Sequence, residues 1–180
     1  MAQDETAGPS TALVVGGFIA VALGTLIASV LYEVLEPALP MLVEGLSPFA
    51  AIYVAAQALE RLLEPLSPWV RASEKSQAKA NFVLASANHD PPAQVAAQRQ
   101  MAVVRADRAI FFWAAATILA MLLSGSMGLF LLHLIGVTGG PPWLDILVTG
   151  LAIGGGTKPL HDLITRIEKG KEKAEKEAAA

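Results

Sequence analysis

Cysteine is absent from this chain of 180 residues, and charged residues are scarce at 16%. Without cysteine the protein has no disulfide framework, no cysteine-ligated metal site and no thiol nucleophile. Charged side chains make up about a quarter of an ordinary soluble domain, so this chain has too few for a fully solvated surface. Hydrophobic residues instead account for 54% of it.

The uncharged residues are gathered in two long apolar runs. Residues 6–32 and 109–144 contain no Asp, Glu, Lys or Arg, and these runs are 27 and 36 residues long. A helix needs about 20 apolar residues to cross a bilayer. We therefore expect an integral membrane protein whose first partner is the lipid bilayer. The first run is expected to be a retained span, because an export signal begins with positive charge and only Asp4 and Glu5 precede this run.

Two shorter apolar segments, 45–59 and 146–157, are either further spans or interfacial segments, and the positive charges decide between these alternatives. All 13 Lys and Arg residues fall within 61–108 or 158–180. Positive residues collect in cytoplasmic loops. The two basic stretches lie on the same side of the membrane only if both short segments also cross it. This distribution predicts an all-α integral membrane protein with four transmembrane helices, arranged as two hairpins, and both termini in the cytoplasm.

The predicted organisation has four parts, and the central one is expected to contain a helix over 69–87, a turn at 88–92 and a second helix that continues into the third span. That central hairpin is either a solvated connector or a surface for a protein partner.

The alanine-rich, lysine-poor composition favours a bacterial origin, hence a multi-pass protein of the bacterial cytoplasmic (inner) membrane. The parts are an N-terminal membrane hairpin at 1–66 with spans near 12–32 and 45–64, a cytoplasmic helical hairpin at 67–108, a C-terminal membrane hairpin at 109–159 with spans near 109–136 and 143–158, and an amphipathic, charged cytoplasmic tail at 160–180.

Small residues recur every four positions in the first and third predicted spans. Such ridges let helix backbones approach closely, and helix association in lipid depends on this packing. They serve either packing within one chain or contacts in a homo-oligomer, which we also expect. The ridge residues are Gly16, Ala20, Gly24 and Ala28 in the first span and Ala116, Ala120, Ser124 and Gly128 in the third.

A glycine-rich segment, Gly154-Gly155-Gly156-Thr157-Lys158-Pro159, lies at the predicted cytoplasmic end of the fourth span. Glycines interrupt a helix, and free backbone N–H groups beside a lysine suit an anionic lipid or a phosphate group. The segment is not a P-loop, because Lys follows Thr and no strand precedes it. A structural hinge is the alternative to a binding site. The candidate contact residues are Gly155, Gly156, Thr157, Lys158 and His161.

Polar side chains are few inside the predicted spans. Gln57 lies well inside the second span, and we expect it to bond across helices. No catalytic set emerges, so we expect a protein that is not an enzyme and takes no metal or cofactor. Nucleic-acid binding is not expected either, because the basic segments are diluted by acids and lack an aromatic platform. The polar residues predicted near the outer interface are His133, Glu33, Glu36, Glu44 and Asp145.

Two functions fit these expectations. The first is a small non-enzymatic membrane scaffold or anchor, which self-associates and recruits a cytoplasmic protein partner through its central hairpin and tail. The alternative is an oligomeric channel or holin-like pore. The four-span plan broadly resembles that of small bacterial and phage holins, and a four-helix chain of this size needs several copies to enclose a pore.

Overall fold

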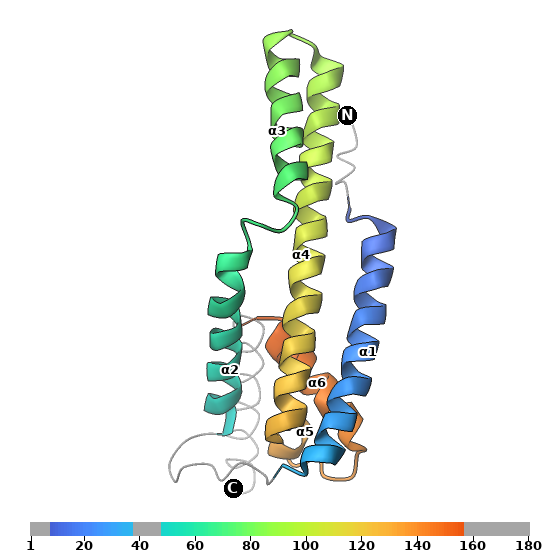
Figure 1. Cartoon of the computed structure of the whole chain (residues 1–180), viewed down its shortest axis with the longest axis vertical. Coiled ribbons are helices and arrows are strands. Elements are labelled where there is room, and N and C mark those ends of the chain that lie inside the picture. Colours follow the sequence, from blue (N-terminus) through green and yellow to red (C-terminus); the bar gives the residue numbers. More distant parts are fainter. Residues whose placement is uncertain (1–7, 38–47, 157–180) are drawn as a thin grey trace, which may run out of the picture.

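The computed structural model describes residues 8–37 and 48–156, and within these ranges every regular element is a helix. The all-helical prediction is confirmed for this part of the chain (Figure 1). The elements are α1 (Thr11–Leu35), α2 (Pro48–Leu63), the short 3-10 helix η1 (Glu64–Leu66), α3 (Ala72–Ala87), α4 (Pro91–Met127), α5 (Leu131–Leu134) and α6 (Pro142–Gly154).

Two of these helices are long and apolar enough to cross a membrane. They are α1, with 25 residues, and α4, with 37. At 1.5 Å per residue they measure about 37 Å and about 55 Å, against roughly 30 Å for the hydrocarbon core of a bilayer. α6 is also apolar but has only 13 residues, and α2 has 16.

α4 is the centre of the packing, and α1 lies along one side of it (Figure 1). The two helices run parallel: Gly17 of α1 faces Ala114, and further along both helices Ala28 faces Gly125. Small residues at these points remove the side chains that would hold the backbones apart. The contact between α1 and α4 is therefore close over most of its length.

α6 and α2 pack against other sides of α4. α6 runs antiparallel to α4, since Gly150 lies against Met121 while the later Gly154 lies against the earlier Thr117. α2 contacts α4, α5 and α6, but within the described residues it does not contact α1. The first two predicted spans thus do not pack as a pair here, and each packs against α4 instead.

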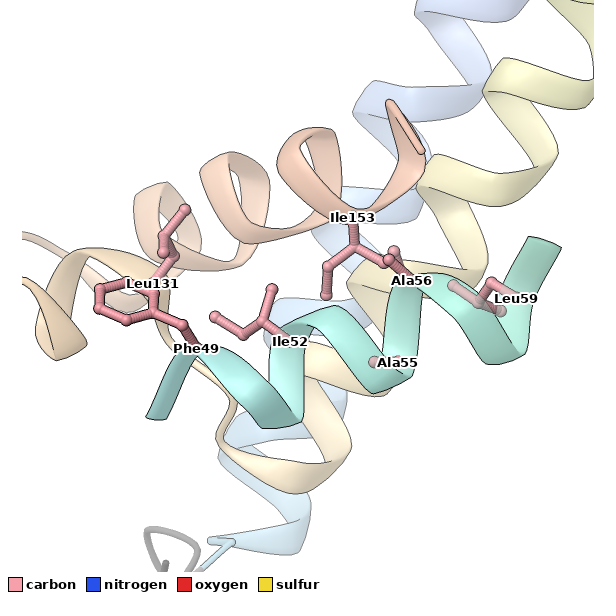
Figure 2. Close-up of a cluster of buried hydrophobic side chains, with 8 residues drawn as sticks. Phe49, Ile52, Ala55, Ala56, Leu59, Leu131 and Ile153 are labelled. Carbon is pink, nitrogen blue, oxygen red and sulfur yellow. The ribbon is translucent and has the colours of Figure 1, made fainter. Parts of the chain in front are cut away.

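α2 is amphipathic, and its apolar side fills the space beside α5 and α6. Phe49 and Ile52 point from α2 toward these helices, with Leu131 beside Phe49 and Ile153 of α6 above Ala56 (Figure 2). Their burial places α2 at the level of the apolar half of α4. The other buried members of this cluster are Ala55, Leu59 and Ala120.

The first part of α4 extends beyond the apolar helices and packs along α3 (Figure 1). We call α3 together with residues 91–108 of α4 the arm. Its helices meet through small side chains, since Ala78, Ala85 and Ala97 are buried. Gln94 adds a hydrogen bond from its side-chain amide to the Ala85 carbonyl at 3.4 Å. The arm is thus a close-packed helix pair without a large apolar core.

The turn between the arm helices is shorter than the predicted 88–92. α4 begins at Pro91 because Asp90 caps it, with Oδ1 of Asp90 accepting a hydrogen bond from Ala93 N at 3.2 Å. The prolines of this first turn lack an N–H. They cost the helix no hydrogen bond, because the N–H groups of a first turn have no partner within the helix. From there α4 continues unbroken to Met127; the lack of Gly and Pro between Ala93 and Gly125 predicts such continuity, and the helix also passes through Gly125.

α4 ends nine residues before 136, the predicted end of the third span. Gly128 takes a left-handed backbone conformation with φ 67°, and its N–H donates to the Ser124 carbonyl. This conformation is accessible to glycine at little cost and stops the helix. The chain then forms the short α5 and returns through a loop to α6.

Candidate functional site

The base of the arm is held by a buried carboxylate on α4. The side chain of Asp107 is only 3% exposed. Its Oδ1 accepts a hydrogen bond of 2.7 Å from Ser10 N, just before α1, and its Oδ2 accepts one from Nη1 of Arg71. Arg71 also pairs with Glu74, with 2.6 Å between Nε and Oε2. Asp107 therefore ties the start of α1 and the start of α3 to α4.

The next residue of α4 binds the linker that follows α2. Nη2 of Arg108 donates to the Ser67 carbonyl and, at 2.9 Å, to the Ser67 hydroxyl. The Nε of Arg108 is buried without a hydrogen-bond partner among the described residues. We call the set of Ser10, Ser67, Arg71, Asp107 and Arg108 the junction. It joins three chain segments at the point where the arm meets the apolar helices.

Arg71 reaches the junction from a strained backbone position. Its φ is 53°, in the left-handed region, and it precedes the first residue of α3. A non-glycine residue in this region costs of the order of 1 kcal/mol. The salt bridge with Asp107 and the packing of the arm offset that cost. The linker therefore turns into α3 at a residue whose side chain belongs to the junction.

Two opposing effects act on the Asp107 carboxyl group, which lies just before the apolar run that begins at Ala109. Burial raises its pKa, because the charged form loses hydration. The hydrogen bond from Ser10 N–H and the pairing with Arg71 outweigh burial and hold the pKa of Asp107 below its ordinary value. The Arg71 pKa is raised, first by its hydrogen bond with Glu74 and then by Asp107, against partial burial. Both groups are charged at neutral pH.

Acid is expected to loosen the junction. The folded pKa of Asp107 lies below the unfolded value of about 3.9, so the ionised carboxylate contributes its full stabilisation above that value and loses it as the pH falls through the folded pKa. The unfolding temperature in detergent, followed by circular dichroism, should fall as the pH is lowered below about 4. The Asp107→Asn variant should show a smaller fall. An equal fall in both proteins would contradict this role for Asp107.

A second buried carboxylate lies at the opposite end of the apolar helices. Asp145 of α6 accepts hydrogen bonds from the backbone N–H groups of Leu132 at 2.8 Å and His133 at 2.9 Å. Thr149 extends this network, accepting from Leu131 N at 2.8 Å and donating to Asp145 at 3.1 Å. A carboxylate here satisfies the free N–H groups at the start of α5 and complements the helix dipole. Asp145 thus fixes α5 onto α6.

The other residues predicted near the outer interface do not join this network. His133 contributes only its backbone N–H to Asp145, and its side chain is exposed. Glu33 and Glu36 are exposed at the end of α1, and Glu44 lies outside the described residues. Asp145 therefore has a structural role, in which it binds backbone N–H groups of α5. Among the described residues, the His133 side chain does not join carboxylates in a chain that could carry protons.

The small residues of the first predicted ridge are placed unequally. Gly24 is buried against Ile118, with 3.0 Å between the position of an added Cβ and the Ile118 side chain, and Ala28 is fully buried. Gly16 is exposed and would have no atom within 4 Å of an added Cβ, and Ala20 is half-buried. The half of this ridge nearer the end of α1 therefore packs within the chain, while its start faces outward.

The third-span ridge is buried over its middle section. Ala120 and Ser124 are fully buried, and Ala116 is half-buried. The Ser124 hydroxyl donates to the Leu129 carbonyl at 2.6 Å, and Gly128 ends the helix. Ser124 thus binds the carbonyl of Leu129, in the connection between α4 and α5.

The predicted glycine-rich segment is described only in part. Gly156 has a φ of 95°, and an added Cβ there would lie 2.8 Å from Oε1 of Glu60. The left-handed backbone favours glycine at this position, where the chain passes close to Glu60. Gly155 caps the end of α6. The other candidate contacts, Thr157, Lys158 and His161, lie outside the described residues.

Among the described residues, Gln57 makes no hydrogen bond to another helix. Its Nε2 donates to the hydroxyl of Tyr53, one turn earlier on α2, at 3.2 Å, and the pair is exposed. Gln57 therefore lies on the exposed outer side of α2, while the half-buried Tyr53 packs at the edge of the cluster that holds α2 in place. The sequence pattern located Gln57 within the helix but not the direction it faces.

The sequence pattern predicts only a topological role for Arg71 and Arg108, and it does not single out Asp107. A signal was available, because Asp107 is the last acidic residue before an uncharged run of 36 residues. A charge at such a position has to reach water or find a partner. Ser10 carried no comparable signal, since it contributes a backbone N–H.

A shallow groove of about 370 Å³ lies between the arm helices near their tip. Its lining mixes amides, a carboxylate and apolar groups, among them Asn81, Leu84, Asp90 and Gln100. Among the residues that the structure describes, no group of three or more His, Cys, Asp or Glu side chains could hold a metal ion. No protein-family model, no curated protein and no solved structure matches the chain.

Proposed function

We propose that the protein is a non-enzymatic membrane anchor, with α1, α2, α4 and α6 embedded in a bacterial inner membrane and the arm projecting into the cytoplasm to dock a soluble partner. The observation that carries this proposal is the continuity of α4. One unbroken helix of 37 residues is packed against apolar helices over its second part and against the polar α3 over its first. A rigid rod then connects the bilayer to the docking surface.

Support for placing α1 in lipid comes from its exposed side. Only 22% of its most apolar stretch is buried inside the chain. A groove lined only by apolar side chains also runs along the contact between α1 and α4. Soluble monomers rarely leave such a continuous apolar face to water. The exposed large side chains of α1 are Val15, Phe18, Ile19, Leu23, Leu26, Ile27, Val30, Val34 and Leu35.

Aromatic residues at both ends of the apolar part are consistent with two membrane interfaces. Trp69 lies in the linker beside the junction and is 81% exposed, and Trp143 lies in the first turn of α6 and is 50% exposed. Tryptophan is enriched at the headgroup level of membrane proteins. Between the level of Ala109 and the end of α4 at Met127 the rise is about 28 Å, which matches a hydrocarbon core.

The topology is testable because the chain has no cysteine. Ala93→Cys, at the tip of the arm, should resist a membrane-impermeant maleimide in intact cells and react after permeabilisation. Thr138→Cys, in the exposed loop between α5 and α6, should react in intact cells. Labelling of Ala93→Cys from outside would contradict the four-span proposal, because it would place the arm on the outer side.

Docking by the arm is expected to depend on the groove near its tip. Leu84→Arg places bulk and charge in the groove, whereas Val83→Arg changes an adjacent exposed residue that does not line it. Loss of a central contact typically weakens a protein complex tenfold or more, roughly 2 kcal/mol. In-cell cross-linking to a soluble partner should therefore fall by about that factor for Leu84→Arg and persist for Val83→Arg. Equal yields would contradict docking at this groove.

A pore formed by several copies is the second candidate function. The observation in its favour is the polar outer side of α2, where Tyr53, Gln57 and Arg61 are spaced four residues apart. Polar side chains at bilayer depth face a protein neighbour or water. Purified protein in liposomes should release an entrapped dye if copies enclose a pore, and should retain it if the protein is only an anchor.

A further inference from the structure

The outer face of α2 has a different character from the outer face of α1. Tyr53, Gln57 and Arg61 follow one another at four-residue spacing, and Val54 and Ala58 lie exposed beside them. On the opposite side, the apolar cluster fixes α2 against α5 and α6 (Figure 2). The polar face therefore cannot turn inward without breaking that cluster.

This face lies deep within the level of the apolar helices. Ala56 packs in one cluster with Ala120 of α4 and Ile153 of α6. The next residue of α6, Gly154, lies against Thr117. Thr117 is eight residues beyond the start of the apolar run at Ala109, which is a depth of about 12 Å. If α4 crosses the bilayer as proposed, Gln57 lies near the middle of the bilayer.

A glutamine facing hydrocarbon at this depth is costly unless its amide is bonded. The bond to Tyr53 uses one amide hydrogen of Gln57. The amide carbonyl and the second hydrogen have no partner among the described residues. Lipid tails supply no hydrogen bonds, so a partner must come from another protein surface or from water.

We propose that the α2 outer face, consisting of Tyr53, Val54, Gln57, Ala58 and Arg61, is the contact surface for a second copy of this chain. A primary amide carries both a donor and an acceptor, so two Gln57 side chains related by a two-fold axis satisfy each other. The ion pair of Arg61 with Glu64, 3.2 Å apart, gives the cytoplasmic end of the face both signs of charge. Such a surface complements itself.

The other surfaces of the chain offer less for self-association. The close backbone approaches at Gly125 and Gly154, and the close contact of Gly150 with the Met121 side chain, are already used between helices of one chain. The outer face of α1 is purely apolar, and lipid covers such a face as well as protein does. A two-fold axis along the membrane normal at α2 leaves both arms on the same side. The dimer would then present two docking grooves together, which raises the avidity for a multivalent partner.

Single cysteines test this contact in membranes while Gln57 is retained. Ala58→Cys should form a disulfide-linked dimer on mild oxidation, and Ile27→Cys, on the exposed face of α1, should give only the background yield. Adding Gln57→Leu to Ala58→Cys should lower the dimer yield about five- to tenfold, as expected for the loss of an interhelical hydrogen bond. Adding Gln57→Asn, which keeps an amide, should retain more of the dimer than Gln57→Leu does.

Three results would overturn the proposal. The first is a dimer yield for Ala58→Cys no higher than that for Ile27→Cys, and the second is a ladder of cross-linked species beyond the dimer, which would indicate a ring. The third is a dimer that forms only after residues 157–180 are removed, because the tail would then be the natural occupant of the face. The inference rests on the proposed membrane placement, which the labelling of Ala93→Cys and Thr138→Cys tests separately. Correct labelling without an Ala58→Cys dimer would refute the contact alone.

Discussion

Replacing Asp107 with alanine is expected to lower the free energy of unfolding by about 3 kcal/mol. The carboxylate is 3% exposed and is shared between Ser10 N–H and the Arg71 guanidinium. Removing it leaves a partly buried positive charge and a backbone donor without their partner, and each such loss is costly. Unfolding in mixed micelles, followed by tryptophan fluorescence and circular dichroism, measures the change.

The location of the damage distinguishes a junction from a generally weakened fold. In Asp107→Ala the linker before α3 should become sensitive to protease, while the contact of α4 with α6, remote from the junction, stays intact. Glu74→Gln is the matched control, because Glu74 pairs with the same Arg71 but its side chain is 42% exposed. Its loss should cost less than about 1 kcal/mol. Similar losses for the two variants would mean that Asp107 has no special role.

Local rules predict those features of the fold that depend on neighbours in the chain. The uninterrupted run after Ala93 predicts a helix that continues into the apolar segment, and α4 does so. Asp90 and the two prolines predict a chain reversal before it, although the helix begins earlier than expected because Pro is well tolerated in a first turn. Helix starts and stops are set within a few residues, so a single sequence is sufficient for them.

The direction in which a helix faces is less accessible from one sequence. A ridge drawn strictly every four residues drifts around a helix that has 3.6 residues per turn. The buried face of α1 instead alternates steps of four and three, through Gly17, Val21, Gly24 and Ala28. Gly16 therefore points outward although it shares the spacing of its neighbours. Which of two adjacent glycines is buried depends on the partner helix, and the chain itself does not specify that locally.

The junction could not be derived from the sequence for a related reason. Ser10 and Asp107 are 97 positions apart, and Arg71 lies between them in the segment 69–87, which the sequence predicts as one helix but which becomes helical only at Ala72. Positive charge near a membrane sets topology by its number and side, which is what the distribution of Lys and Arg indicates. Arg71 contributes to that distribution and also forms a specific ion pair with Asp107. Only the packing of α1 beside α4 brings the three groups together.

Substituting alanine for Gly125 is expected to destabilise the protein by about 2 kcal/mol, although alanine is the better helix former by about 1 kcal/mol. A Cβ at this position would press into the backbone carbonyl of Ala28 on α1, and 3.3 Å would separate it from the Ala28 Cβ. A backbone atom cannot change rotamer, so α1 and α4 would have to separate. The neighbouring contacts, including the hydrogen bond from the Thr25 hydroxyl to Met121 Sδ at 3.4 Å, would then be weakened.

Gly16→Ala provides the matched control for this prediction, because it makes the same substitution on the outward side of α1. An added Cβ at Gly16 meets nothing within 4 Å, so only the gain in helix propensity acts, and the variant should be neutral or up to about 1 kcal/mol more stable. The two variants should therefore shift unfolding in micelles in opposite directions, or at least by clearly different amounts. A Gly125→Ala protein as stable as Gly16→Ala would show that α1 and α4 do not approach through Gly125 and Ala28 in the folded protein. The close contact that aligns α1 with the junction would then have to lie elsewhere along the two helices.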